Sequence, residues 1–160
     1  MPWQSTKTFG HELGISCAFR QWRATHSHCR FLHGYALSFK FTFEADTLDD
    51  KNWVQDFGSM KRIKEELQYD FDHKTVVAHD DPEFHWFEEA AAAGILELTV
   101  LPAVGCEKFA EHAYNLAYKH LIQEKLDHRI RIISCEVAEH GANSAIYTPR
   151  REYKDAMTQP

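Results

Sequence analysis

Residues Ser16 to Glu44 read S-C-A-F-R-Q-W-R-A-T-H-S-H-C-R-F-L-H-G-Y-A-L-S-F-K-F-T-F-E, and this stretch has the clearest structural pattern in the chain. In its second half, large apolar side chains occupy every other position: Tyr35, Leu37, Phe39, Phe41 and Phe43. A period of two places alternate residues on opposite faces of an extended strand. The pattern therefore predicts a half-buried antiparallel strand over Tyr35 to Ala45.

A polar loop directly precedes this strand and holds several reactive side chains. It contains His26, His28, Cys29 and His33, followed by Gly34. A thiol and several imidazoles beside a rigid strand are well placed for chemistry, because loops on a rigid scaffold often carry function. The alternative is chance clustering among eleven histidines, with a free thiol that only packs.

The bulk composition narrows the class of protein. A chain of 160 residues fits one domain with a sizeable core. Its 18 basic and 24 acidic residues give a net charge of −6, which argues against nucleic acid as a general partner but allows a small anionic substrate. No apolar run approaches the roughly 18 residues of a membrane span, and no secretory signal is recognisable. Four cysteines without a C-x-x-C pair fit free thiols, so we expect a cytoplasmic protein.

The other elements follow from periodicity and from turn and capping residues. Asp56 is a suitable N-cap for an amphipathic helix that ends near Tyr69. A second, longer helix is predicted over Cys106 to Glu124. Further pieces are a strand over Thr6–Ala18 with a bend at Gly10 and Gly14, a short apolar run over Thr75–Ala78, a short helix over Pro82–Ala93, an extended segment over Ile95–Leu101, and strands over Arg129–Glu139 and Ser144–Thr148. Simple alternation along Arg129–Glu139 places Glu139 on the face opposite Ile130 and Ile132.

The order of these elements is strand, strand, helix, insertion, helix, strand, strand, which favours an α+β fold. We expect a four-stranded antiparallel sheet with two main helices on one face and an insertion at about 81–101. The chain then forms a single domain over 1–160, with a core at about 6–148 and a polar C-terminal tail at 149–160. Because such a sheet has two open edges, which other subunits usually cover, we expect a homo-oligomer.

Four motifs occur in a fixed order: C-R-F-L-H-G-Y at 29–35, W-V-Q-D-F at 53–57, D-H at 72–73, and E-H-G-A-N-S-A-I-Y at 139–147. In this order and spacing the chain resembles the 6-pyruvoyl-tetrahydropterin synthase and 6-carboxy-tetrahydropterin synthase family, over roughly residues 6–148. The resemblance implies a T-fold, with ββααββ subunits that associate into barrels, commonly hexamers, and pterin sites between subunits. It also implies a lyase that eliminates triphosphate from 7,8-dihydroneopterin triphosphate. The 6-carboxy branch, an enzyme of queuosine (7-deazaguanine) biosynthesis, also releases acetaldehyde.

The resemblance also implies roles for individual residues. Cys29 falls on the family's catalytic cysteine, and Asp72 and His73 fall on its Asp-His pair. Glu139 falls on the glutamate that anchors the pterin ring, and Glu107 on the glutamate at the start of the second helix. These roles are chemically reasonable, because a thiolate or imidazole can remove a proton beside a reduced ring and a carboxylate matches the paired N–H donors of the pterin edge. The alternatives are that Cys29 is an unreactive loop thiol, that Asp72 and His73 only end a helix, and that Glu139 is a solvated carboxylate at the end of a strand.

The chain departs from the family at the metal. The family binds zinc with three histidines, but only His33 matches here, while Phe19 and Tyr35 stand at the other two positions. A catalytic zinc normally needs three protein ligands, whereas Phe cannot ligate and a neutral Tyr is a poor ligand. Either His26 or His28 rebuilds a zinc site with His33, or the site is metal-free. No organic cofactor is expected.

The main prediction is therefore a pterin enzyme with an altered zinc site, acting on a small molecule without nucleic acid or membrane as partner. Two alternatives stay open: a non-enzymatic pterin- or purine-binding T-fold protein, and a metal-free lyase closer to the dihydroneopterin aldolases. His140 stands where the family has Thr beside the anchoring Glu139. It supplies either an acid or base in the pocket or a cap for the turn.

Overall fold

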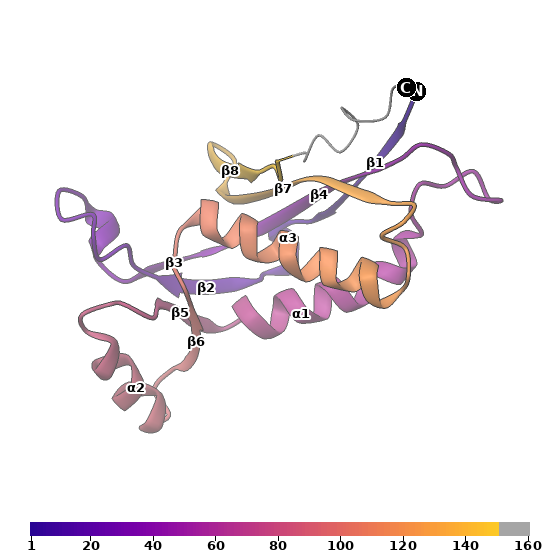
Figure 1. Cartoon of the computed structure of the whole chain (residues 1–160). Coiled ribbons are helices and arrows are strands. Elements are labelled where there is room, and N and C mark those ends of the chain that lie inside the picture. The colour runs from indigo at the N-terminus through magenta and orange to yellow at the C-terminus, as the bar shows by residue number, and fades with distance from the viewer. Residues whose placement is uncertain (151–160) are drawn as a thin grey trace, which may run out of the picture.

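The computed structural model describes residues 1–150, and these form two four-stranded sheets with three α-helices (Figure 1). The first sheet is antiparallel throughout, in the order β1 (Trp3–Phe9), β4 (Ser38–Ala45), β7 (Arg131–His140) and β8 (Asn143–Tyr147). From residue 151 on, the predicted polar tail lies outside the described residues. The predicted α+β architecture with a four-stranded antiparallel sheet is confirmed.

The second sheet has the order β3 (His33–Ala36), β2 (Ser16–Phe19), β5 (Lys74–Ala78) and β6 (Glu97–Leu101). β2 and β3 are antiparallel, but β2–β5 and β5–β6 are parallel. The predicted insertion supplies β6 together with α2 (Phe84–Ala92). The insertion is therefore an integral part of this second sheet.

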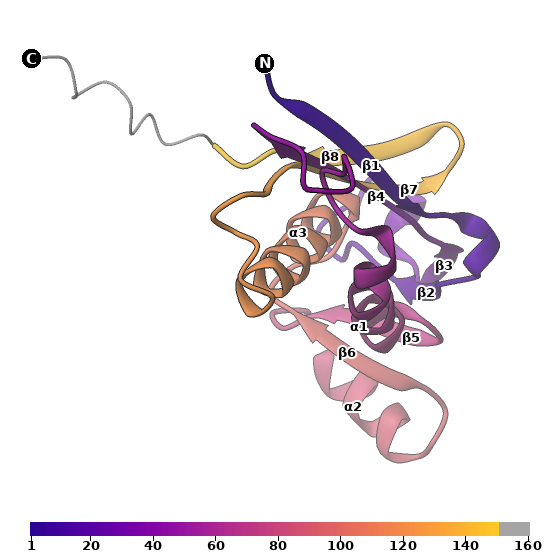
Figure 2. The same ribbon diagram turned by 90° about the vertical axis from the view of Figure 1, so that its right-hand side faces the viewer.

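Two helices, α1 (Lys61–Phe71) and α3 (Cys106–Gln123), lie on one face of the first sheet (Figure 2). α1 follows a short 3-10 turn, η3 (Phe57–Met60), at which Asp56 accepts a hydrogen bond of 2.8 Å from the backbone N–H of Gly58. Asp56 therefore caps this 3-10 turn, which continues directly into α1, whereas the N-cap residue of α1 itself is Met60. The core between sheet and helices consists of fully buried side chains: Phe39, Phe41 and Phe43 of β4, Ile63 and Leu67 of α1, and Phe109, Ala113 and Ala117 of α3.

The long strand predicted over Tyr35 to Ala45 divides at Leu37, so that β3 belongs to one sheet and β4 to the other. The preceding strand divides as well, with the 3-10 turn η1 (His11–Leu13) between β1 and β2. The bend is local, because Gly14 has a left-handed φ of 65° and the Leu37 N–H bonds the Ile15 carbonyl at 2.8 Å. β1 also begins at Trp3, earlier than the predicted Thr6.

A β-bulge in β7 overturns the simple alternation expected there. Phe43 pairs with Ile132 but Thr42 pairs with Ser134, so Ile133 is the extra residue. Beyond the bulge, Cys135 and Val137 are fully buried on the helix side of the sheet. The bulge therefore reverses which residues of β7 face the helices.

Among residues 1–150, none of the helices combines the length and the apolar character that crossing a lipid bilayer requires.

Candidate functional site

The candidate site lies where β3, the first turn of α3 and the β7–β8 hairpin come together, at the left of Figure 1. Three aromatic side chains line it. Phe19 of β2 pairs directly with His33 of β3, and Tyr35 lies two residues further along, so all three share one face of the sheet. The ring centroids are 6.1 Å apart for Phe19 and His33, 6.4 Å for Phe19 and Tyr35, and 5.4 Å for His33 and Tyr35. We call these three residues the aromatic wall.

Each member of the wall is held by its own contacts. Phe19 is 5% exposed and packs edge-to-face on Phe109 of α3, with 4.9 Å between ring centroids. His33 places Nδ1 at 2.7 Å from the backbone carbonyl of Phe31. Because a carbonyl only accepts, Nδ1 carries the proton and Nε2 is the acceptor of the ring. The tautomer of His33 thus leaves one nitrogen lone pair for a ligand.

Tyr35 lies close enough to Glu139, Cys29 and Cys106 for their charges to act on its hydroxyl. Burial raises the pKa of Tyr35 above its usual value of 10.0, and so do the negative charge of Glu139 and, once they are ionised, the thiols of Cys29 and Cys106. The phenol is therefore neutral near pH 7 and able to donate a hydrogen bond. The ring of His140 lies 6.1 Å from the Tyr35 ring. These interactions bring the predicted Cys29 and Glu139 to the same side chain.

Glu139 reaches the first turn of α3, where it meets Cys106. Burial raises the pKa of the Cys106 thiol to about 12, helped by the charge of Glu139, by a hydrogen bond to Glu139 and by the charge of Glu107. The thiol consequently stays protonated and donates to the Glu139 carboxylate. Glu107 stands in the first turn of α3, where the helix dipole favours a negative charge. Two carboxylates and a neutral thiol thus line one side of the site.

Cys29 lies on the loop that closes this end of the molecule. It is exposed within the 3-10 turn η2 (His28–Arg30), and its backbone N–H bonds the Ser27 hydroxyl at 3.1 Å. The loop is tied down because the backbone N–H of Gln21, just after β2, bonds the Cys29 carbonyl at 2.8 Å. The predicted catalytic cysteine is therefore exposed, on a loop that is tied to the end of β2.

A sequence model of the 6-pyruvoyl tetrahydropterin synthase family matches residues 10–150. The chain belongs to this family. The 6-carboxy-5,6,7,8-tetrahydropterin synthase of Aquifex aeolicus is 24% identical, covering 92% of this chain and 98% of the relative. An uncharacterized protein from Wolinella succinogenes superposes with a TM-score of 0.76 at 17% identity, covering 94% and 99% of the two chains. The 6-pyruvoyl tetrahydropterin synthase of Plasmodium falciparum gives 0.65 at 16% identity, covering 91% and 96%. The resemblance inferred from the motifs, and with it the T-fold, is confirmed.

The Asp-His pair of this synthase-family chain lies apart from Cys29. His73 donates through Nδ1 to Asp72 at 2.9 Å, and the His73 side chain is 85% exposed. Its backbone N–H bonds the Ser16 carbonyl at the first residue of β2, whereas the Cys29 loop follows the last residue of that strand. The three residue steps from Ser16 to Phe19 span roughly 10 Å along β2, and the Cys29 loop begins only after Phe19. One chain alone therefore does not bring Asp72 and His73 to Cys29.

The residues at the family's zinc position do not fit a zinc ion. The aromatic wall contributes the lone pair of His33, a phenyl ring and a neutral phenol, which is one ligand where three are needed. The His28 ring packs on Phe31 with centroids 6.3 Å apart. Throughout residues 1–150, His, Cys, Asp and Glu side chains form no group of three that could hold a metal.

The sequence did not identify Cys106 as a residue of the site, and it did not show that Tyr35 lies near Cys29 and Glu139. Cys106 directly precedes Glu107 at the start of a helix, and that adjacency was the available signal. The contact between Cys106 and Glu139 joins residues 33 positions apart and depends on the irregular register of β7. Local sequence patterns do not reveal either.

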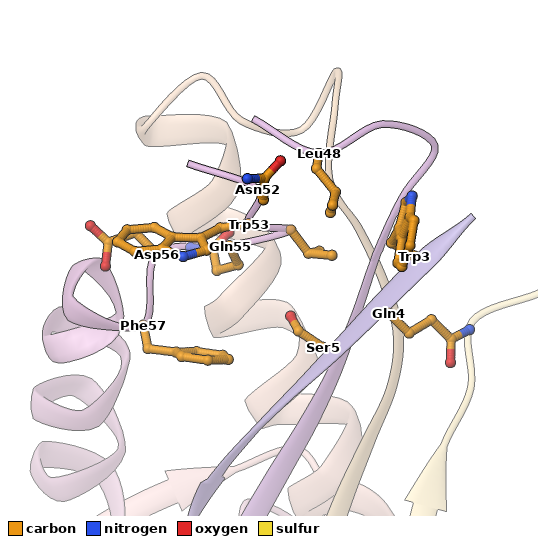
Figure 3. Close-up of a pocket in the computed structure, with 10 residues that line it drawn as sticks. Trp3, Gln4, Ser5, Leu48, Asn52, Trp53, Gln55, Asp56 and Phe57 are labelled. Atoms are coloured by element: carbon orange, nitrogen blue, oxygen red, sulfur yellow. The ribbon is translucent and has the colours of Figure 1, made fainter. Parts of the chain in front are cut away.

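A separate cavity of about 480 Å³ lies near the N-terminus, between β1 and residues 48–57 (Figure 3). Trp3, Trp53 and Phe57 line it, and Ser5 points toward it from β1. Trp3 pairs with Ala45, at the end of β4 that is furthest along the chain from β3 and Tyr35. This cavity is therefore distinct from the candidate site.

Proposed function

We propose that this chain is a lyase that acts on 7,8-dihydroneopterin triphosphate, as in the 6-carboxy- or 6-pyruvoyl-tetrahydropterin branch of its family. The observation that carries the proposal is the position of Glu139 and Cys29 near Tyr35, with Glu107 beside the Cys106 thiol that bonds Glu139. A carboxylate, an accessible thiol and aromatic side chains at one site suit a flat heterocycle with paired N–H donors and a reactive side chain.

Glu139 holds the pterin ring in this proposal. Its carboxylate accepts from the 2-amino group and the neighbouring ring N–H, and the Cys106 thiol orients it from behind. Because hydrogen bonds to a charged group contribute about 1.5–3 kcal/mol each, this contact dominates recognition. Glu107 adds a second carboxylate beside it, at the positive end of α3.

Cys29 takes a proton from the substrate side chain. A thiolate is an effective general base, and the exposed position of Cys29 leaves its sulfur accessible to the substrate. The exposed Asp72–His73 pair completes the site from a neighbouring subunit, with Asp72 fixing the tautomer of His73. β1 and β8 are the open edges of the first sheet, and we propose that they pair between subunits of a homo-oligomer, with a hexamer as the assembly to test.

A second candidate function is favoured by the aromatic wall. Phe19 and Tyr35 replace two zinc ligands, which suits a metal-free lyase on a pterin such as an aldolase, or a protein that binds the pterin without turning it over. Turnover separates these cases, because only the lyases consume the pterin.

The experiment compares Cys29→Ala and Glu139→Gln with the wild type, using pterin fluorescence for affinity and chromatography for turnover. We expect Glu139→Gln to weaken binding about 10- to 100-fold, consistent with the loss of a charged hydrogen bond. Glu136→Gln, three residues away on β7, is the matched control and should bind normally. Cys29→Ala should bind the pterin but lose turnover. Undiminished turnover in Cys29→Ala would refute its role, and unchanged affinity in Glu139→Gln would remove the ring anchor.

A further inference from the structure

The zinc position of the family is filled here by side chains that pack together. Phe19 is 5% exposed and touches Phe109, whose ring also lies 5.1 Å from that of Phe71. Phe19 is thereby part of the hydrophobic core. It occupies space beside His33 that a metal and its open coordination site would need.

We propose that this chain binds no zinc at the aromatic wall, and that the wall instead forms a metal-free surface on which the substrate side chain lies, with the Tyr35 hydroxyl as hydrogen-bond donor. The claim that no zinc binds, which we call the zinc half, depends only on the side chains available as ligands. The claim that the substrate side chain lies on the wall, which we call the ligand half, rests on the proposed function, because it takes a pterin as the molecule bound.

The donor count supports the zinc half. His33 offers only Nε2, since Nδ1 donates to the Phe31 carbonyl at 2.7 Å. Tyr35 would have to ionise in order to ligate well, and its partly buried position near Glu139 opposes a second negative charge. One neutral imidazole without two further ligands does not hold zinc against water.

The geometry supports the ligand half. The Tyr35 ring lies near two imidazoles, 5.4 Å from that of His33 and 6.1 Å from that of His140. A neutral phenol donates a hydrogen bond, and the Nε2 of His33 accepts one. A hydroxylated side chain attached to the pterin ring therefore meets both a donor and an acceptor at the wall. Phe19 adds an apolar surface beside them.

The first test is zinc content. Wild-type protein, purified without a nickel column, is incubated with zinc, gel-filtered and analysed for metal, and its affinity is measured against a chromogenic chelator. We expect background zinc in the wild type and no change in His33→Ala. Phe19→His/Tyr35→His should gain about one zinc per chain, the stoichiometry of a three-histidine site. Adding His33→Ala to this variant should abolish the gain.

A matched control places the same two substitutions elsewhere. Trp86→His/Tyr118→His replaces two exposed aromatic side chains on different helices and should stay at background. About one zinc per wild-type chain that is lost in His33→Ala overturns the proposal. This result does not depend on whether the double variant folds.

The second test is pterin binding in the presence of a chelator. Wild-type affinity should be the same with chelator and with added zinc, and Tyr35→Phe should weaken binding about 10-fold through the lost hydrogen bond. Affinity that rises with zinc, or that ignores Tyr35→Phe, overturns the ligand half. If no variant binds a pterin under any condition, the proposed function and the ligand half both fail, while the zinc measurement still decides the metal half.

Discussion

Arg20→Met should destabilise the protein severely, because it leaves a buried carboxylate without its partner. Arg20 follows β2 at the start of the Cys29 loop, and Asp81 stands at the start of the insertion. The guanidinium donates to both carboxylate oxygens, at 2.9 and 2.5 Å. The Asp81 side chain is 1% exposed and that of Arg20 is 22% exposed. This ion pair thus joins the loop to the insertion in the interior of the molecule.

The magnitude follows from burial. Removing one partner of a buried ion pair costs about 3–5 kcal/mol, whereas a solvent-exposed pair contributes about 0–1 kcal/mol. The chain offers a matched exposed pair three residues away, in which Arg23 donates to Asp80 at 2.6 Å with side chains 63% and 38% exposed. Arg23→Met should therefore cost less than about 1 kcal/mol.

The assay is urea unfolding followed by tryptophan fluorescence, at one protein concentration so that any assembly contributes equally. With a slope of about 2 kcal/mol/M, the midpoint of Arg20→Met should fall by roughly 1.5–2.5 M. Arg20→Met/Asp81→Leu should recover about 2 kcal/mol, because the unpaired charge is gone. If Arg20→Met costs no more than Arg23→Met, the buried pair does not stabilise the fold as argued.

Three further outcomes are expected. His120 is buried with no hydrogen-bond partner for either ring nitrogen within residues 1–150, and burial lowers its pKa below the usual 6.5. Below pH 6.5 the folded state then binds fewer protons than the unfolded state, so the free energy of unfolding should decrease as the pH falls. Urea titrations at pH 5 to 7 measure this dependence, and His120→Leu should flatten it. Gly34→Ala should destabilise the fold by several kcal/mol, because its Cβ would lie 2.5 Å from the Cys17 carbonyl oxygen, while Gly141→Ala, with open space around it, should melt close to the wild type. Tyr35→Phe should leave the melting temperature within a few degrees of the wild type, since the ring still packs; a large loss would show that the hydroxyl is needed for folding rather than for a ligand.

Much of the candidate site could be predicted from the sequence, but its assembly could not. Cys29, Glu139, Glu107 and His33 were identified from ordered motifs. The structure places Cys29, Glu139 and His33 near Tyr35, and Glu107 near Cys106. Asp72 and His73 form the predicted pair, yet they sit at the far end of β2 from the Cys29 loop. Local patterns do not measure distances between segments, and they say nothing of what a second subunit adds.

The sequence by itself determined the helices, the main strands and the family. These elements follow from local properties that need no knowledge of distant contacts: the 3.6-residue and two-residue hydrophobic periods, the capping residue Asp56 and the order of the motifs. Only the tertiary structure decided the division at Leu37, the parallel pairing of β2, β5 and β6, and the bulge at Ile133 that reverses the faces of β7. Strand partners and register depend on side chains far apart in the chain that compete for one core, so the same alternating pattern fits several pairings until the whole sheet is packed.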